Sequence, residues 1–136
     1  MPGRILVADA PEAFDRLKKA LSHQYQLDFA EHYDQAISLL KSNHYDLLIC
    51  GEHFDDSKMF ELMGAAKFEL KLHDLAMLCF RHLHSRFSAQ VHKAVQMSAE
   101  LMGACRFIDE AHDIDDAAIL KAVEECIAFH AASRQS

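Results

Sequence analysis

The sequence predicts an α/β domain built as a three-layer α/β/α sandwich, with a five-stranded parallel sheet between two layers of helices. Short apolar runs, typical of strands buried on both faces, alternate with longer segments whose apolar residues recur at helical spacing. Strict alternation with short links is typical of parallel strands joined by right-handed helical crossovers. The 136 residues, 51% of them hydrophobic and 26% charged, fit one globular domain. We expect that domain to span residues 1–130, with residues 131–136 as a tail or the start of a linker.

The first half of the chain contains three of the expected strands. Residues 5–8 form an apolar run, and Pro11 and Glu12 suit the first turn of a helix after it. Residues 25–30 alternate enough for a second strand, and residues 36–40 mark a second helix that ends near Ser42. Residues 47–50 are the clearest central strand, stopped by Gly51.

The second half contains the other two strands. Asp55, Asp56 and Ser57 are N-cap candidates for a third helix. Residues 75–80 are an uninterrupted apolar run, and the helical period then extends from residue 87 to residue 102, ending at Gly103. Residues 105–108 form a short fifth strand, and Asp115 lies at the start of the last helix.

Composition excludes several classes of protein. The formal charge of −7 argues against nucleic-acid binding, which requires a concentrated basic surface. No apolar run approaches the ~20 residues of a membrane span, and no secretory signal is visible, so we predict a cytoplasmic protein without a membrane partner. The cysteines are widely spaced in apolar segments, so free buried thiols are favoured over disulfides or a zinc site; they are Cys50, Cys79, Cys105 and Cys126.

Four segments resemble the response-regulator receiver family, in order and over essentially the whole chain. Residues 4–9 resemble its first strand, and residues 45–50 the third strand that leads to the phospho-accepting aspartate. Residues 60–62 fall in register with its third helix, and residues 103–108 resemble the Gly-Ala-x-x-Tyr-Leu entry to its fifth strand. The resemblance implies a flavodoxin-like, receiver-type sheet of order 2-1-3-4-5. It also implies that the fourth helix, or the loop before it, is extended here.

The family's phosphorylation site is largely lost. That site requires an acceptor aspartate, two acids that hold a magnesium ion, a hydroxyl residue and a lysine. Asp9 keeps one acid, Ala10 replaces its partner, and Gly51 stands at the acceptor position. Cys79 replaces the hydroxyl residue, and Glu110 reverses the charge of the lysine. The vestigial pocket is therefore expected to comprise Asp9, Ala10, Gly51, His53, Cys79 and Glu110, with no catalytic residue, cofactor or metal.

The resemblance therefore implies a pseudo-receiver of a two-component-type response regulator. It would act by protein–protein interaction and not as an enzyme. The alternative is a receiver that responds to a metal, redox signal or small molecule at the vestigial pocket, for example at Asp9, His53 and Cys79. Flavin and cobalamin binders of the same strand order are disfavoured because their loop motifs are absent.

Other polar residues have simpler explanations. Glu52, Asp55 and Asp56 are interpreted as a helix cap and solvated charge. A metal cluster at His82, His84 and His92 is disfavoured because the gap of eight residues between the last two does not match the i,i+4 spacing of helical ligand pairs.

The charge along the second half is uneven, which is more often the result of two differently solvated faces but can also reflect a contact surface. From residue 81 to residue 106 there are four basic residues and one acid, and from residue 109 to residue 125 there are seven acids and one base. In receivers, the face made by helix four, strand five and helix five commonly docks partners. We expect a protein partner, an output domain or a second copy of the chain here. The candidate contact residues are Arg86, Lys93, Arg106, Asp115, Asp116 and Lys121.

Overall fold

The computed structural model describes residues 3–52, 54–82, 89–110 and 114–134. Its strands are β1 (Gly3–Ala8), β2 (Tyr25–Ala30), β3 (Leu47–Gly51), β4 (Ala76–Arg81) and β5 (Ala104–Asp109). Its α-helices are α1 (Pro11–Leu21), α2 (Tyr33–Ser42), α3 (Met59–Gly64), α4 (Ala89–Leu101) and α5 (Asp116–Arg134). A π-helix, η1 (Ala65–Glu69), continues α3 and was not predicted.

The five strands form one parallel sheet of order β2-β1-β3-β4-β5, which confirms the predicted architecture. The central strands β3 and β4 are buried along their whole length, because helices cover both faces of the sheet. Parallel strands all end at the same edge. The residues that follow β1, β3, β4 and β5 therefore meet at the carboxyl edge of the sheet.

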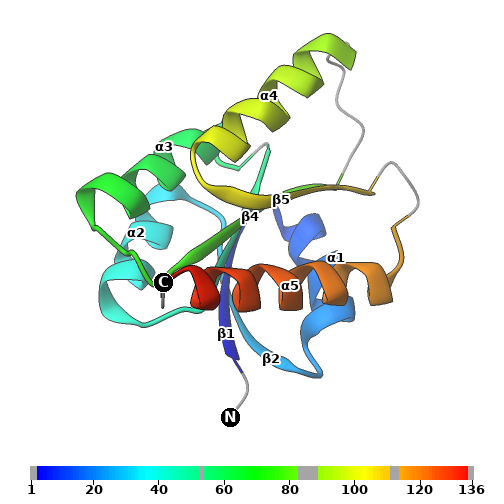
Figure 1. The fold of residues 1–136 in the computed structure, drawn as a ribbon, viewed down its shortest axis with the longest axis horizontal. Coiled ribbons are helices and arrows are strands. Elements are labelled where there is room, and N and C mark those ends of the chain that lie inside the picture. Colours follow the sequence, from blue (N-terminus) through cyan, green and yellow to red (C-terminus); the bar gives the residue numbers. More distant parts are fainter. Residues whose placement is uncertain (1–2, 53, 83–88, 111–113, 135–136) are drawn as a thin grey trace.

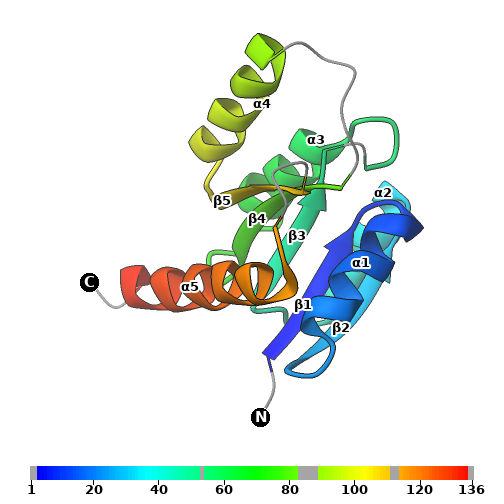
Figure 2. The ribbon, with the colours of Figure 1, turned by 90° about the vertical axis from the view of Figure 1, so that its right-hand side faces the viewer.

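Two hydrophobic cores fill the space between the sheet and the two layers of helices, whose ribbons are drawn in Figure 1. One core contains apolar residues of α1 and α5, and the other contains those of α2, α3 and α4. Along each strand, successive side chains alternate between the cores, as the pleat requires. Figure 2 shows that α4 and α5 flank β5 at one edge of the sheet, so these three elements share a surface.

The predicted N-cap of the third helix is wrong. Asp55, Asp56 and Ser57 have positive φ angles of 41°, 55° and 66°, and α3 begins only at Met59. The Asp55 carboxylate instead accepts a hydrogen bond of 2.7 Å from the backbone N–H of Tyr33, in the first turn of α2. Asp55 therefore stabilises the start of a neighbouring helix, where a negative charge is favourable.

The cysteine prediction is half wrong. Cys50 and Cys79 are free and buried, as expected. Cys105 of β5 and Cys126 of α5, however, form a disulfide across 21 positions of sequence. The packing of α5 against β5 brings their Cα atoms to 5.8 Å, within the range of a disulfide, although sequence spacing gives no sign of it.

The segment before α4 is not tested by the structure, and the end of α5 differs from the expected boundary. Residues 83–88, between β4 and α4, lie outside the described residues, so the expected extension before the fourth helix stays a prediction. The last helix runs to Arg134, past the tail boundary expected after residue 130. Within the described ranges, no helix combines the length and apolarity required to cross a membrane.

Candidate functional site

Charged residues gather at the carboxyl edge of the sheet, around the ends of four strands. Asp9 follows β1, Glu52 follows β3, Arg81 and Asp109 end β4 and β5, and Glu110 comes next. Two of these, Asp9 and Glu110, were predicted pocket residues. The structure thus brings Asp9 and Glu110 to one edge. Glu52 lies there too, as expected of the loop after the third strand, and so do two charged residues that were not predicted at this edge, Arg81 and Asp109.

Asp9 is buried, with only 5% of its surface exposed. Its Oδ1 accepts a hydrogen bond of 2.8 Å from the backbone N–H of Ala10. Its Oδ2 is buried and has no hydrogen-bond partner among the described residues. Burial disfavours the charged form, and it raises the pKa of the Asp9 carboxyl from 3.8 to about 7. Asp9 is therefore partly protonated near neutral pH when no cation is bound.

Gly51 lies directly beside the Asp9 carboxyl. A Cβ atom added to Gly51 would lie 2.0 Å from Asp9 Cγ and 2.0 Å from its Oδ1, far inside the contact distance of non-bonded atoms. The carboxyl group of Asp9 thus occupies the volume in which any side chain at position 51 would begin. Position 51, where the resemblance places the acceptor, has no side chain, and the Asp9 carboxyl lies where one would begin.

Arg81 supplies a buried positive charge at this edge. Its Nη1 donates a hydrogen bond of 2.8 Å to Asp109 Oδ2, and its Nε lies 3.5 Å from Glu52 Oε2. All three side chains are at most 9% exposed, so little water screens the cluster. The interpretation of Glu52 as solvated charge is therefore wrong. Arg81 and Asp109 each end an apolar run in the sequence, but only the register of β4 with β5 shows that they pair.

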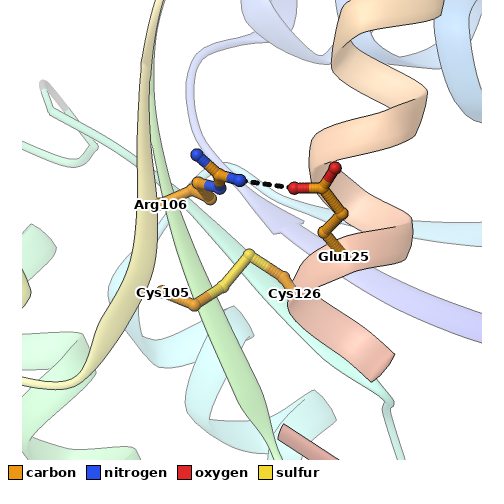
Figure 3. The surroundings of a disulfide bond; sticks show 4 residues. All are labelled: Cys105, Arg106, Glu125 and Cys126. Carbon is orange, nitrogen blue, oxygen red and sulfur yellow. Dashed lines mark hydrogen bonds and ion pairs between the residues drawn. A yellow bond between two sulfur atoms is a disulfide. The ribbon is translucent and has the colours of Figure 1, made fainter. Parts of the chain in front are cut away.

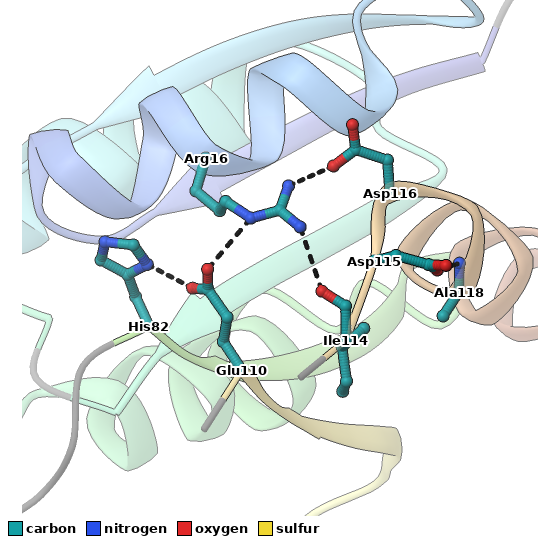
Figure 4. Close-up of polar contacts among 7 residues, drawn as sticks. All are labelled: Arg16, His82, Glu110, Ile114, Asp115, Asp116 and Ala118. Carbon is teal, nitrogen blue, oxygen red and sulfur yellow. Dashed lines mark hydrogen bonds and ion pairs between the residues drawn. The ribbon is translucent and has the colours of Figure 1, made fainter. Parts of the chain in front are cut away.

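Glu110 belongs to a second ionic network (Figure 4). One of its carboxylate oxygens contacts His82 Nδ1, and the other accepts a 3.0 Å hydrogen bond from Arg16 Nε on α1. The Arg16 guanidinium also donates to the Ile114 carbonyl oxygen at 3.2 Å and to the carboxylate of Asp116. Glu110 thus connects the end of β5 with the end of β4 and with α1 through polar contacts. Arg16 in turn connects α1 with the start of α5.

Of the other predicted pocket residues, Ala10 lines the same pocket as Asp9, whereas Cys79 lies in a different part of the core. Cys79 belongs to the core under α2 and α3, where its Sγ lies 3.7 Å from Met63 Sδ. Phe80, the next residue along, instead lines the same pocket as Asp9. Burial raises the pKa of the Cys79 thiol to about 12, so it stays protonated. His53 lies outside the described residues. Among those that are described, no group of three His, Cys, Asp or Glu residues is arranged to hold a metal ion.

A small cavity remains beside Asp9. It measures about 50 Å³, and the residues that line it include Asp9, Glu12, Glu52 and Arg81. This volume is enough for one or two water molecules, and not for a nucleotide or a flavin.

The residues of the predicted contact face make different interactions, and some of these are within the domain. Arg106 of β5 pairs with Glu125 of α5, which also has Lys121 Nζ at 4.0 Å. Asp115 accepts a 2.8 Å hydrogen bond from the backbone N–H of Ala118 and so caps α5 (Figure 4).

The other residues of that face are bonded internally, exposed to solvent, or outside the described residues. Asp116 is bonded to Arg16, as described above. Lys93 of α4 is exposed, while Arg86 and His84 fall outside the described residues, as does the side chain of His92.

Large apolar side chains add to this face, and charge patterning had not revealed them. Met97 and Leu101 of α4 are 54% and 84% exposed, and Phe129 of α5 is 69% exposed. They flank β5 from both sides. Exposed apolar groups of this size, mixed with charged residues, are typical of contact surfaces.

Comparison with solved structures identifies the architecture. The signal receiver domain of an HD domain-containing protein from Pseudomonas fluorescens Pf-5 superposes with a TM-score of 0.76 and 21% identity, over 98% of this chain and 92% of that one. The chain has the receiver fold. A response regulator from Thermotoga maritima matches with a TM-score of 0.75 and 17% identity, over 94% of this chain and 99% of that one.

A longer protein contains the same fold as one of its parts. NtrX from Brucella abortus matches with a TM-score of 0.80 and 18% identity, over 99% of this chain but 29% of that one. No protein-family model and no curated protein sequence matches the chain.

Proposed function

We propose that this chain is a pseudo-receiver of a two-component-type response regulator, which works in the cytoplasm through protein contacts and without aspartyl phosphorylation. One observation carries the proposal: the Asp9 carboxyl fills the volume in which an acceptor side chain at Gly51 would begin. Phosphoryl transfer to a receiver requires a carboxylate at that point, in line with the donor and next to a bound cation. Here the one remaining acid occupies that space and is partly neutral.

The two ionic networks support a fixed conformation at this edge. In an active receiver, a lysine and a hydroxyl residue respond to the new phosphoryl group. In this chain the lysine position holds Glu110, already bonded to His82 and Arg16. The end of β4 holds Arg81, whose guanidinium is bonded to Asp109. In a domain with these ion pairs, the charges at this edge stay paired with one another. In an active receiver, by contrast, the contacts at this edge change on phosphorylation.

We infer that the partner-docking surface is the face made by α4, β5 and α5. Support comes from the exposed apolar side chains of Met97, Leu101 and Phe129, together with the charged residues Lys93 and Arg106 around them. A protein or an output domain fits such a surface, whereas a net charge of −7 disfavours nucleic acid.

Beryllofluoride with magnesium tests the loss of the phosphoryl site, because this anion mimics an acyl phosphate only where an acceptor carboxylate and a metal site exist. In an NMR titration, we expect no magnesium-dependent shift of the backbone amides of Asp9, Gly51 and Glu110. A saturable, magnesium-dependent shift at these amides would overturn the proposal.

Sedimentation tests the docking surface with a second copy of the chain as the first partner. We expect concentration-dependent dimerisation at low salt that Leu101→Asp weakens. Phe68→Asp serves as the matched control, since Phe68 is also exposed, at 62%, but lies in η1 outside this face. A strict monomer at high concentration and low salt would rule out self-association through the face.

A further inference from the structure

The Cys105–Cys126 disulfide opens onto a hollow in the protein surface. The hollow measures about 410 Å³ and lies between β5 and α5; it is lined by Ala104, Cys105, Arg106, Glu125, Cys126 and Phe129. Figure 3 shows the bond bridging the strand and the helix, with the Arg106–Glu125 ion pair beside it. A molecule of the size of a small peptide has room to approach the bond from solvent.

The two sulfur-bearing residues differ in exposure. Cys105 is partly exposed, whereas Cys126 is buried, with 1% of its surface accessible. Thiol–disulfide exchange requires access to the sulfur that is attacked. Cys105 is therefore the accessible end of the bond and Cys126 the buried end. The free cysteines Cys50 and Cys79 are fully buried and provide internal controls.

The rest of the contact between α5 and β5 does not depend on the bond. Ile119 and Val123 of α5 are fully buried in the core shared with α1. The ion pair between Arg106 and Glu125 spans the same two elements. The folded domain can therefore hold α5 in place while the bond is opened, which a site of reversible chemistry requires.

We propose that the Cys105–Cys126 disulfide is a thiol-exchange site, at which a low-molecular-weight thiol such as glutathione forms a mixed disulfide with Cys105. The thiolate of the small molecule attacks Cys105 Sγ, and a new S–S bond forms as the Cys105–Cys126 bond breaks. The electron pair leaves on Cys126 Sγ, which takes a proton from water. The incoming thiol is oxidised and Cys126 is reduced, so the step balances without another reactant.

A second thiol molecule completes the reduction. It attacks the mixed disulfide, forms a low-molecular-weight disulfide and leaves Cys105 as a thiol; the same small disulfide drives the reverse reaction. In the cytoplasm proposed above, disulfides are typically transient or redox-sensing. Reversible exchange fits that compartment, although the reactivity itself does not depend on location.

The two single-cysteine variants give a matched test. Cys126→Ser leaves Cys105 as the free thiol, and Cys105→Ser leaves Cys126. Each folded variant is incubated with glutathione disulfide, and the mixed disulfide is followed by intact mass and peptide mapping. We expect modification of Cys105 in the first variant to be at least about tenfold faster than modification of Cys126 in the second, because of the difference in access. Equal rates in the two folded variants would overturn the proposal.

The wild-type protein gives an independent test that does not rely on either variant folding. The protein is treated with reduced glutathione, quenched with acid, and mapped for mixed disulfides. We expect the glutathione adduct on Cys105, with Cys50 and Cys79 unmodified until denaturant is added. A bond that resists glutathione while the protein is folded, or adducts distributed over all four cysteines, would contradict the assignment.

Discussion

Substitution of Asp9 by asparagine tests whether burial in the pocket holds the Asp9 carboxyl in its neutral form. Burial raises the pKa of the Asp9 carboxyl from 3.8 to about 7. Between these two values the unfolded chain has lost a proton that the folded chain still binds, so stability falls as the pH rises. Below pH 3.8 the carboxyl is protonated in both the folded and the unfolded chain, so burying it costs no free energy of ionisation. A difference of about 3 pKa units corresponds to about 4 kcal/mol of unfolding free energy above pH 7.

Asparagine has the shape of aspartic acid without its charge. Its amide oxygen can keep the hydrogen bond from the Ala10 backbone N–H. We therefore expect Asp9→Asn to be more stable than the wild type by up to about 4 kcal/mol near pH 8, with the difference vanishing near pH 4. The assay is urea denaturation followed by circular dichroism at several pH values in that range.

A surface carboxylate serves as the matched control. Asp15 of α1 has a side chain that is 75% exposed and lies 3.8 Å from Lys18, so Asp15→Asn removes the same charge without a buried site. Its effect should stay within about 1 kcal/mol across the pH range. If the wild type and Asp9→Asn differ by the same small amount at every pH, the Asp9 carboxyl is not held neutral by burial, and our account of the pocket is refuted.

Three further predictions use the same unfolding assay. Gly51→Ala should destabilise the domain by about 1–3 kcal/mol, because its Cβ collides with Asp9; the double variant with Asp9→Gly should recover part of that loss, and an undisturbed single variant would contradict the collision. Glu110→Gln removes the carboxylate that both Arg16 and His82 contact and should cost about 1–3 kcal/mol; a neutral result would mean that the network adds nothing. Reduction of the Cys105–Cys126 bond, which closes a loop of 21 positions, should cost about 3 kcal/mol, and equal stability of both redox forms would refute this value.

The fold could be predicted from the sequence because its signals are local and repeated. Apolar runs at residues 47–50 and 75–80 mark the central strands, and both strands are buried throughout. The order of the strands followed from the resemblance to receivers, and the structure confirms it. The proposed loss of the acceptor rests on Gly51, since glycine has no side chain to phosphorylate.

The missed features depend on contacts between distant residues. Nothing in the spacing of Cys105 and Cys126 distinguishes them from Cys50 and Cys79, because only the packing of α5 on β5 brings the first two together. Arg81 and Asp109 look like ordinary charges until the strand register pairs them.

Two further sequence-based assignments were wrong, each for its own reason. Asp55 has the chemistry of a helix cap, but it caps α2 across the loop and not the helix that follows it. Cys79 was assigned to the pocket by counting along the strand, and the pleat places its side chain in the opposite core.

The most direct test of the central claim is phosphorylation with a small-molecule donor. The chain is incubated with acetyl phosphate and magnesium, and its intact mass is measured, with an active receiver treated in parallel as the positive control. We expect no gain of a phosphoryl group on this chain, because position 51 has no acceptor and Asp9 fills its space. A magnesium-dependent gain of one phosphoryl group, removed by hydroxylamine as an acyl phosphate is, would contradict the claim that the phosphorylation site is lost.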